Sequence, residues 1–319
     1  MTFASTGLRR LLALALACTA FPALARNDNV YVASQSSDTV SVIDAASHTL
    51  TATIPVGKAP ISLAVSPDGS TVYVANANSD SVSVINAATN TVTATIPVGN
   101  TPNALAVSPN GAELYVANAN ESSVSIVDTA THTTMATVAV GSLPLTIGAN
   151  ASGTRVYTGN VGDFTVSVID TATHTVTENM PVTASPDSLV VGPLGARVYV
   201  ASYNENVVSV IDTFKNTVTG VLKAGKGPDA VATSPIGIPL YVANADDNTV
   251  SVINPFTKTV ISTIPVGTSP AAIAFNRRTG RIYTSDFGSD TVTVIDARTN
   301  KVIATVGTAH HPSFVAVQP

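Results

Sequence analysis

Asp187 and Asp229 are the acidic residues of this sequence that could bind a cation together. Each directly follows a proline, and the two lie 42 residues apart. If the fold brings the two carboxylates together, they could attract a cation. Two other arrangements are open: the acids could be solvated, or they could pair with the nearby Lys226, and a surface ion pair of that kind contributes little to stability.

The histidines are the other candidate ligands. His310 and His311 are adjacent, so they could supply two metal ligands, but successive side chains of an extended chain point in opposite directions. A metal site usually needs three or four converging ligands. The other histidines share one position of a sequence repeat, where further copies carry Asn, which indicates turn residues: His48, His132 and His174. We therefore predict no metal site and no cofactor.

Motifs of known catalytic chemistry are missing from the sequence. There is no Gly-X-Ser-X-Gly elbow, no His-Glu-X-X-His, no phosphate-binding glycine loop and no cysteine nucleophile. Paired carboxylates contributed by distant segments remain an open route to hydrolysis. A non-enzymatic role is favoured, and the alternative is a hydrolase or lactonase-like enzyme that uses a cation held by the acids and histidines.

The sequence repeats with a period of 42 residues, and this repeat determines where the candidate side chains lie. Seven tyrosines follow this period without exception: Tyr31, Tyr73, Tyr115, Tyr157, Tyr199, Tyr241 and Tyr283. Seven prolines follow it too: Pro60, Pro102, Pro144, Pro186, Pro228, Pro270 and Pro312. Residues 26–319 span seven such periods with no net insertion or deletion. Repeats of about 40–50 residues built from short strands are typical of propeller blades.

Each repeat contains four expected strands. In the second repeat they cover 62–66, 72–75, 81–85 and 91–98, and an Asp-Gly pair at 68–69 marks the turn between the first two. The fourth strand alternates apolar residues with threonine, so one of its faces meets water. Prolines fall late in this strand, at 55, 97, 181 and 265. Proline cannot donate a ladder hydrogen bond, so the fourth strand is expected at the outer edge of each blade.

The chain ends predict how the ring closes. Residues 30–33 align with the second strand of the other repeats, and residues 313–317 align with the first strand. Both ends of the chain should therefore complete one blade. The sequence predicts an all-β, seven-bladed propeller of 42-residue, four-stranded blades, closed by the C-terminal strand joining the N-terminal blade.

Three tetrads carry a resemblance to a known family: Tyr73-Val74-Ala75-Asn76, Tyr115 to Asn118 and Tyr241 to Asn244, with Ser66-Pro67-Asp68-Gly69 upstream of the first. They resemble the YVTN β-propeller repeat family over residues 26–319. The resemblance implies a seven-bladed propeller, commonly exported or at the cell surface, and says little about activity. Because that family includes surface-layer proteins, a surface-layer or adhesive role is a further alternative. The edge prolines argue against self-association and favour a monomer.

One face of a propeller, which carries the loops between second and third strands and between blades, usually binds ligands. The best candidates there break the repeat: Lys58, Asn103, Asp187, Lys226, Asp229, His310 and His311 between blades, and Tyr203 and Phe287 within them. Exposed aromatic residues often anchor interfaces, although these two could also pack on neighbouring loops. We predict a binding site at the channel mouth for an unidentified protein or a small-molecule or envelope ligand.

Two repeated features are weaker indications of a binding site. A polar residue follows each second strand: Ser34, Asn76, Asn118, Asn160, Ser202, Asn244 and Asp286. These side chains could line a central funnel, but we favour the alternative that each one bonds within its own loop. On the opposite face, arginines gather in one turn, and they could contact anionic headgroups or polysaccharide or form a solvated rim: Arg277, Arg278 and Arg281.

The N-terminal segment predicts export. Arg9 and Arg10 precede an apolar stretch at 11–17, and Ala23-Leu24-Ala25 supplies a cleavage site, so residues 1–25 are expected to be a signal peptide. The stretch is too short to span a bilayer. Lipid attachment at Cys18 is an open alternative with a poor lipobox. The product should be periplasmic or extracellular, and 15 basic against 20 acidic residues argue against general nucleic-acid binding.

Overall fold

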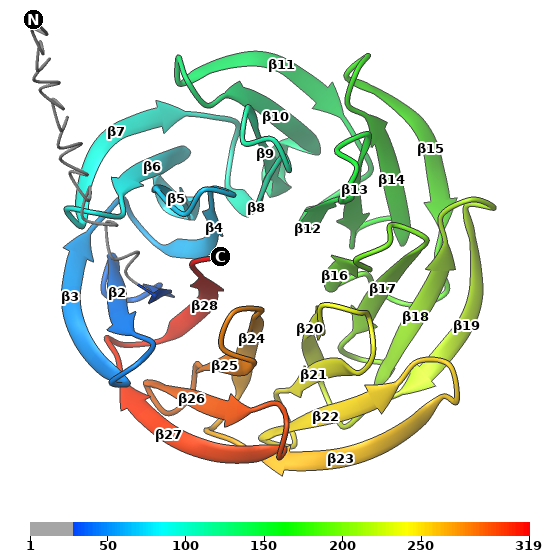
Figure 1. Cartoon of the computed structure of the whole chain (residues 1–319). Helices are drawn as coiled ribbons and strands as arrows, with labels where there is room; N and C mark the ends of the chain where they lie inside the picture. Colours follow the sequence, from blue (N-terminus) through cyan, green and yellow to red (C-terminus); the bar gives the residue numbers. More distant parts are fainter. Residues whose placement is uncertain (1–27) are drawn as a thin grey trace, which may run out of the picture.

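Seven four-stranded antiparallel sheets form a ring in the computed structural model (Figure 1). The structure describes residues 28–319; the expected signal peptide and Cys18 lie outside the described residues. Blade 1 contains β28, β1, β2 and β3, and blades 2 to 7 follow in chain order from β4 to β27. The predicted seven-bladed propeller is therefore confirmed. Among the described residues, no helix is long and apolar enough to cross a membrane.

The strands occupy four positions in every blade. The innermost are β28 (Pro312–Val317), β4 (Pro60–Val65), β8 (Pro102–Val107), β12 (Pro144–Ala149), β16 (Ser188–Val191), β20 (Pro228–Thr233) and β24 (Pro270–Asn276). The second are β1 (Asn29–Ser34), β5 (Thr71–Asn76), β9 (Glu113–Asn118), β13 (Arg155–Asn160), β17 (Arg197–Ser202), β21 (Leu240–Asn244) and β25 (Arg281–Asp286). The third are β2 (Thr39–Asp44), β6 (Ser81–Asn86), β10 (Ser123–Asp128), β14 (Thr165–Asp170), β18 (Val207–Asp212), β22 (Thr249–Asn254) and β26 (Thr291–Asp296). The outermost are β3 (Thr49–Pro55), β7 (Thr91–Pro97), β11 (Thr133–Ala139), β15 (Thr175–Pro181), β19 (Thr217–Lys223), β23 (Thr259–Pro265) and β27 (Lys301–Gly307).

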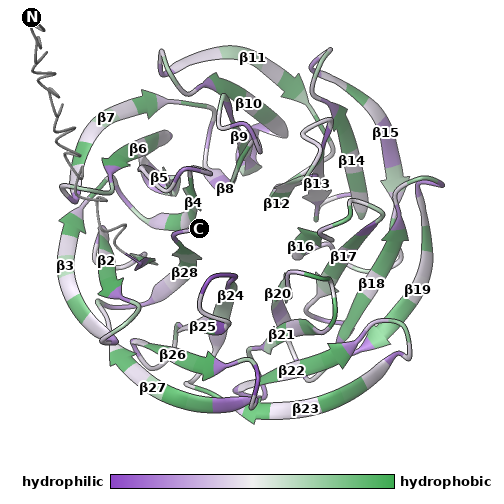
Figure 2. Cartoon of the chain, in the orientation of Figure 1, coloured by the Kyte–Doolittle hydropathy of each residue, from purple (hydrophilic) through white to green (hydrophobic). Residues whose placement is uncertain are grey.

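The hydrophobic core lies between blades. Tyr73 of β5, for example, packs with Leu105 and Leu114 of the next blade, and the second and third strands are buried on both faces because neighbouring blades cover them. Apolar residues alternate with threonine in the outer strands β3 and β7, whose colouring can be followed in Figure 2. The prediction that the fourth strand forms the outer edge is confirmed.

The two chain ends close the ring in one sheet. Strand β28 pairs antiparallel with β1, with Val30 opposite Val317 and Ala33 opposite Phe314, as the alignment of the termini predicted. Strand β4 begins two residues earlier than expected: Pro60 pairs with Asn76 across an irregularity in the register before Ser62. Short 3-10 helices, η1 (Ala77–Ser79) and η2 (Ala119–Glu121), follow β5 and β9.

We name two faces of the ring by what they carry. The loop face carries the loops between second and third strands and between blades. The turn face carries the turns that join first to second and third to fourth strands.

Candidate functional site

A cavity of about 710 Å³ opens on the loop face at the centre of the ring. Every blade contributes to it the residue that follows the repeated proline: Ile61, Asn103, Leu145, Asp187, Asp229, Ala271 and Ser313. The innermost strands face the middle of the ring in Figure 1, so these seven positions meet around one axis. The repeat therefore builds a cavity with seven equivalent wall positions, and the sequence differs at those positions.

The charge in the cavity wall comes from two adjacent blades. Of the described residues that line the cavity, only Asp187 and Asp229 are charged. Asp187 is held in place, because its carboxylate accepts hydrogen bonds from the Ser185 hydroxyl at 2.8 Å and the Tyr203 backbone N–H at 2.7 Å. The Asp229 side chain has no hydrogen-bond partner among the described residues. Burial raises the pKa of Asp229 to about 7, and the charges of Asp187 and Asp246 add to the shift.

Two aromatic residues complete this side of the cavity wall. The Tyr203 hydroxyl donates to the Asp246 carboxylate of blade 6 at 2.5 Å, which raises the pKa of Tyr203 to about 12. The Phe287 ring stacks on His311, with centroids 4.5 Å apart and planes 10° apart. Both aromatic side chains line the cavity and contact a neighbouring loop. Their role as anchors of an interface stays a prediction.

The remaining candidates lie outside the cavity or are engaged elsewhere. Asn103 lines the wall, but its amide donates to the Leu145 carbonyl at 2.8 Å and links blades 3 and 4. On the rim, Lys58 pairs with Asp38 at 2.7 Å. His310 pairs there with Asp290 at 2.8 Å.

The alternatives that needed Lys226 or converging histidines do not match this geometry. Lys226 is exposed and forms no ion pair with any residue that the structure describes, so the alternative in which it pairs with the two acids is not observed. His311 lies against Phe287 and places its Nδ1 2.7 Å from the Ser36 hydroxyl. Within residues 28–319, no group of three or more His, Cys, Asp or Glu side chains could hold a metal ion.

Comparison with known proteins supports the fold. A model of the YNCE-like beta-propeller family matches residues 4–111, about a third of the chain. Among solved structures, Kuenenia stuttgartiensis hydrazine synthase is 22% identical, with a TM-score of 0.77 over 85% of this chain and 93% of that chain. A functionally unknown protein from Desulfotomaculum acetoxidans DSM 771 is 15% identical, with a TM-score of 0.81 over 91% of this chain and 98% of that chain. No curated protein matches the sequence. These similarities concern the propeller fold, and the YVTN resemblance stays a prediction.

The repeated polar residue at the end of each second strand is buried, and this corrects one interpretation. Asn244 donates from Nδ2 to Thr249 and Ser251 of the third strand, at 3.1 and 2.9 Å, and its Oδ1 accepts from the Gly225 N–H. These side chains stabilise the blade interior, so they form no ring around the funnel. The favoured interpretation, in which each side chain caps its own loop, is wrong for Asn76 and Asn118: neither makes a side-chain cap, and their Nδ2 atoms donate to third-strand hydroxyls instead.

A glycine of the preceding loop faces each of these amides. A Cβ at Gly57 would lie 2.6 Å from Cγ of Asn76, and the same conflict recurs at Gly99, Gly141 and Gly225. It also recurs at Gly267, which faces the carboxyl of Asp286 instead of an amide. In the two blades where the polar residue is Ser34 or Ser202, the loop position is Ala309 or Thr183. The larger amide therefore requires glycine, and the smaller serine permits a side chain.

Asp286 replaces the buried amide in blade 7, and its substitution gives a pH-dependent prediction. Burial raises the pKa of the Asp286 carboxyl, although hydroxyls of Thr284 and Thr293 donate to it at 2.7 and 2.6 Å. The ionised form is therefore disfavoured in the fold, and stability is lost as pH rises from the unfolded pKa through the folded one. We expect Asp286→Asn to raise the free energy of unfolding near pH 7 by about 1 kcal/mol, and by less near pH 4.

Urea unfolding at the two pH values measures this effect. The reverse change in blade 6, Asn244→Asp, is the matched control and should lower stability near neutral pH. A stability gain for Asp286→Asn that does not change with pH would rule out the ionisation argument.

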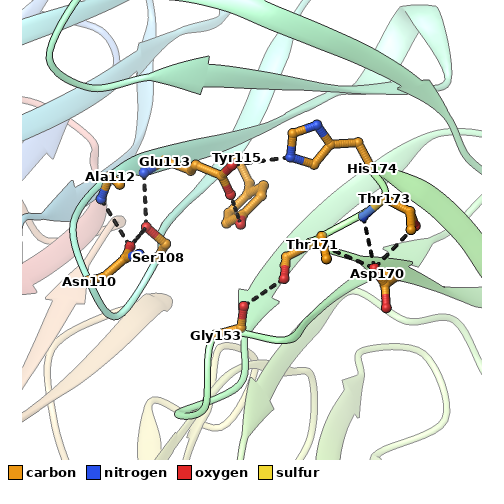
Figure 3. A network of polar contacts seen from close by, with 11 residues as sticks. Ser108, Asn110, Ala112, Glu113, Tyr115, Gly153, Asp170, Thr171, Thr173 and His174 are labelled. Carbon is orange, nitrogen blue, oxygen red and sulfur yellow. Dashed lines mark hydrogen bonds and ion pairs between the residues drawn. The ribbon is translucent and has the colours of Figure 1, made fainter.

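A polar network on the turn face links blades 3 and 4 (Figure 3). Glu113 accepts hydrogen bonds from the Tyr115 hydroxyl and from Nε2 of His174, the latter at 3.1 Å. His174, His48 and His132 all have positive φ, which fits their interpretation as turn residues. The link itself was missed from the sequence. Its signal is that Glu113 occupies the repeat position held by Arg155 and Arg197 in the next blades.

The arginines of the turn face also connect blades. Arg278 pairs with Asp28 at 2.8 Å, and Arg281 donates to the Ala45 carbonyl of blade 1. Arg155 donates in the same way to the Thr213 carbonyl of blade 5 at 2.9 Å. Contacts between blades therefore engage several of the arginines for which the sequence left open an anionic contact or a solvated rim.

Proposed function

We propose that this protein is an exported, non-enzymatic binding module whose central cavity on the loop face holds an organic cation. The cation is either a free small molecule or a Lys or Arg side chain of a partner protein. One observation carries the proposal: the only charges among the described lining residues are two carboxylates on adjacent blades, and Asp229 has no hydrogen-bond partner there.

The electrostatics favour a positively charged ligand. A partly buried carboxylate near a second one is costly when ionised, and an opposite charge at short range offsets that cost. Asp229, with a pKa of about 7, is poised between the neutral and charged forms, so a bound cation would favour the charged form. The aromatic rings of Tyr203 and Phe287 in the same wall offer cation–π contact.

Export belongs to the same proposal. The signal-like order of Arg9-Arg10, the apolar stretch and Ala23-Leu24-Ala25 supports delivery to the periplasm or the cell exterior. There the cavity would meet envelope molecules or the side chains of envelope proteins.

Calorimetric titration with butylammonium and methylguanidinium, with butanol as the neutral control, tests the proposal. We expect both cations to bind more tightly than butanol. The Asp187→Asn/Asp229→Asn variant should lose roughly tenfold or more in cation affinity, because each cation then lacks its buried counter-charge.

Glu205→Gln is the matched control. It removes an exposed charge from the same face outside the cavity, and it should leave affinity unchanged. Equal binding of butanol and butylammonium, or full cation affinity in the double variant, would contradict the proposal.

A further inference from the structure

Four large apolar side chains protrude from the turn face of blades 5 and 6. Their exposed fractions are 88% for Leu194, 85% for Phe214, 76% for Ile236 and 60% for Phe256. Leu194 and Ile236 lie in turns between first and second strands, and the two phenylalanines lie in turns between third and fourth strands. We call these four residues the apolar tips.

The apolar tips break the repeat in two neighbouring blades. The position of Leu194 and Ile236 is polar in other blades, as Asp68, Asn110 and Ser152. The position of Phe214 and Phe256 is alanine in four other blades: Ala46, Ala88, Ala130 and Ala172. The fold therefore needs no large apolar residue at these sites. Strongly exposed, clustered apolar residues usually mark an interaction surface.

The four tips belong to one surface. A Cβ built on Gly237, next to Ile236, would lie 3.4 Å from the ring of Pro193, next to Leu194, so the two inner turns adjoin. Leu194 and Phe214 line one small cavity of about 270 Å³. The guanidinium of Arg197, three residues beyond Leu194, lies 4.6 Å from the centre of the Phe256 ring.

Basic residues surround the tips, although the whole chain is acidic. Lys215 directly follows Phe214, and Lys258 lies two residues after Phe256; both are exposed. Arg155 and Arg197 reach the same turns. The nearest acid in these turns, Asp212, accepts backbone N–H bonds from Phe214 and Lys215, and these bonds together with the charges of Lys215 and Arg197 lower its pKa.

We propose that the turn face of blades 5 and 6 docks on an anionic lipid bilayer. Protruding aromatic and aliphatic tips can insert among headgroups, and a collar of Lys and Arg binds the negative lipid surface. A surface that receives a protruding segment of a partner protein would be concave, whereas the apolar tips protrude. Because the tips lie on the turn face, docking leaves the central cavity open on the opposite side of the ring.

Sedimentation with vesicles of equal parts phosphatidylglycerol and phosphatidylcholine tests this inference with the full exported chain. We expect binding that weakens with added salt and is much weaker on pure phosphatidylcholine. Phe214→Ala/Phe256→Ala, which installs the alanine of other blades, should reduce partitioning by roughly tenfold per phenylalanine. Lys215→Gln/Lys258→Gln should reduce binding to the anionic vesicles alone.

The matched control is Val302→Ala/Ile303→Ala on outer strand β27, where both side chains are also exposed, and it should bind like the wild type. No binding to anionic vesicles, or equal binding by the phenylalanine variant, would overturn the proposal. So would concentration-dependent dimerisation that the phenylalanine variant abolishes, because the tips would then contact a second copy.

Discussion

Asp229→Asn should make the protein more stable near pH 8, by about 1–3 kcal/mol, while it weakens cation binding. In the fold the pKa of Asp229 is raised to about 7 from its usual value of 3.8, mainly by burial. A shift of one pKa unit corresponds to about 1.4 kcal/mol. Because the side chain is partly exposed, the free-energy cost of its ionisation is smaller than the whole shift would give. An amide carries no charge at any pH, so the variant avoids this cost.

The sign of the pH dependence follows from the raised pKa. The neutral carboxyl is compatible with the fold, so no cost applies below about pH 4. The cost grows as pH rises through the interval up to about 7, and it is constant above. The stability difference between variant and wild type should therefore be small near pH 4 and largest near pH 8. Cation binding by the wild type should strengthen over the same interval, because the carboxylate becomes charged.

Urea unfolding of both proteins at the two pH values checks this prediction. Glu205→Gln controls for the loss of one negative charge on the same face, and it should show no such pH-dependent gain. If Asp229→Asn instead lowered stability at both pH values, Asp229 would be a structural residue. A residue that costs stability and serves binding is typical of functional sites.

Gly57→Ala should be strongly destabilising, by about 3 kcal/mol. The added Cβ would lie 2.6 to 2.8 Å from Cγ, Nδ2 and Cβ of Asn76, which is fully buried, so neither side can move freely. Adding Asn76→Ser should recover most of that loss. The pair would then match Ala309 and Ser34, which blade 1 already uses.

A double-mutant cycle by urea unfolding measures this coupling, which we expect to be about 2 kcal/mol. Asn76→Ser alone should cost about 1 kcal/mol, because the Nδ2 bonds to Ser81 and Ser83 are lost. Ala309→Gly is the matched control in the blade that accepts a side chain, and its cost should be below about 1 kcal/mol. Additive effects of the two substitutions at 57 and 76 would contradict the steric explanation.

The 42-residue period made most of the fold predictable. Seven tyrosines in one phase imply seven equivalent blades, and the alignment of the two chain ends gives the closing strand. The prolines of the outer strands identify the blade edge because they cannot donate in a ladder. The start of strand β4 was two residues off, since the pairing of Pro60 with Asn76 passes through an irregular register that no residue type signals.

The site could be predicted only in part. The rule that functional residues break the repeat directed attention to Asp187 and Asp229, which the structure places in the cavity wall. The rule could not distinguish residues of the cavity wall from residues of the rim, because that distinction depends on where each loop side chain points. Lys58 and His310 turn to Asp38 and Asp290 instead.

The buried amides and the apolar tips show what else was missed and why. Asn76 is polar and repeated, and only packing shows that it points into the blade. Phe214 and Phe256 stand at an alanine position of the repeat, so the same rule could have identified them had it been applied to the turn face.

Native mass spectrometry of the protein isolated from the cells that produce it tests the central claim most directly. We predict a bound cationic species, either a small amine or guanidine or a partner protein, that the Glu205→Gln variant retains and the Asp187→Asn/Asp229→Asn variant loses. A bound species that is neutral or anionic, or one that the double variant retains, would contradict the assignment of the central cavity as a cation site.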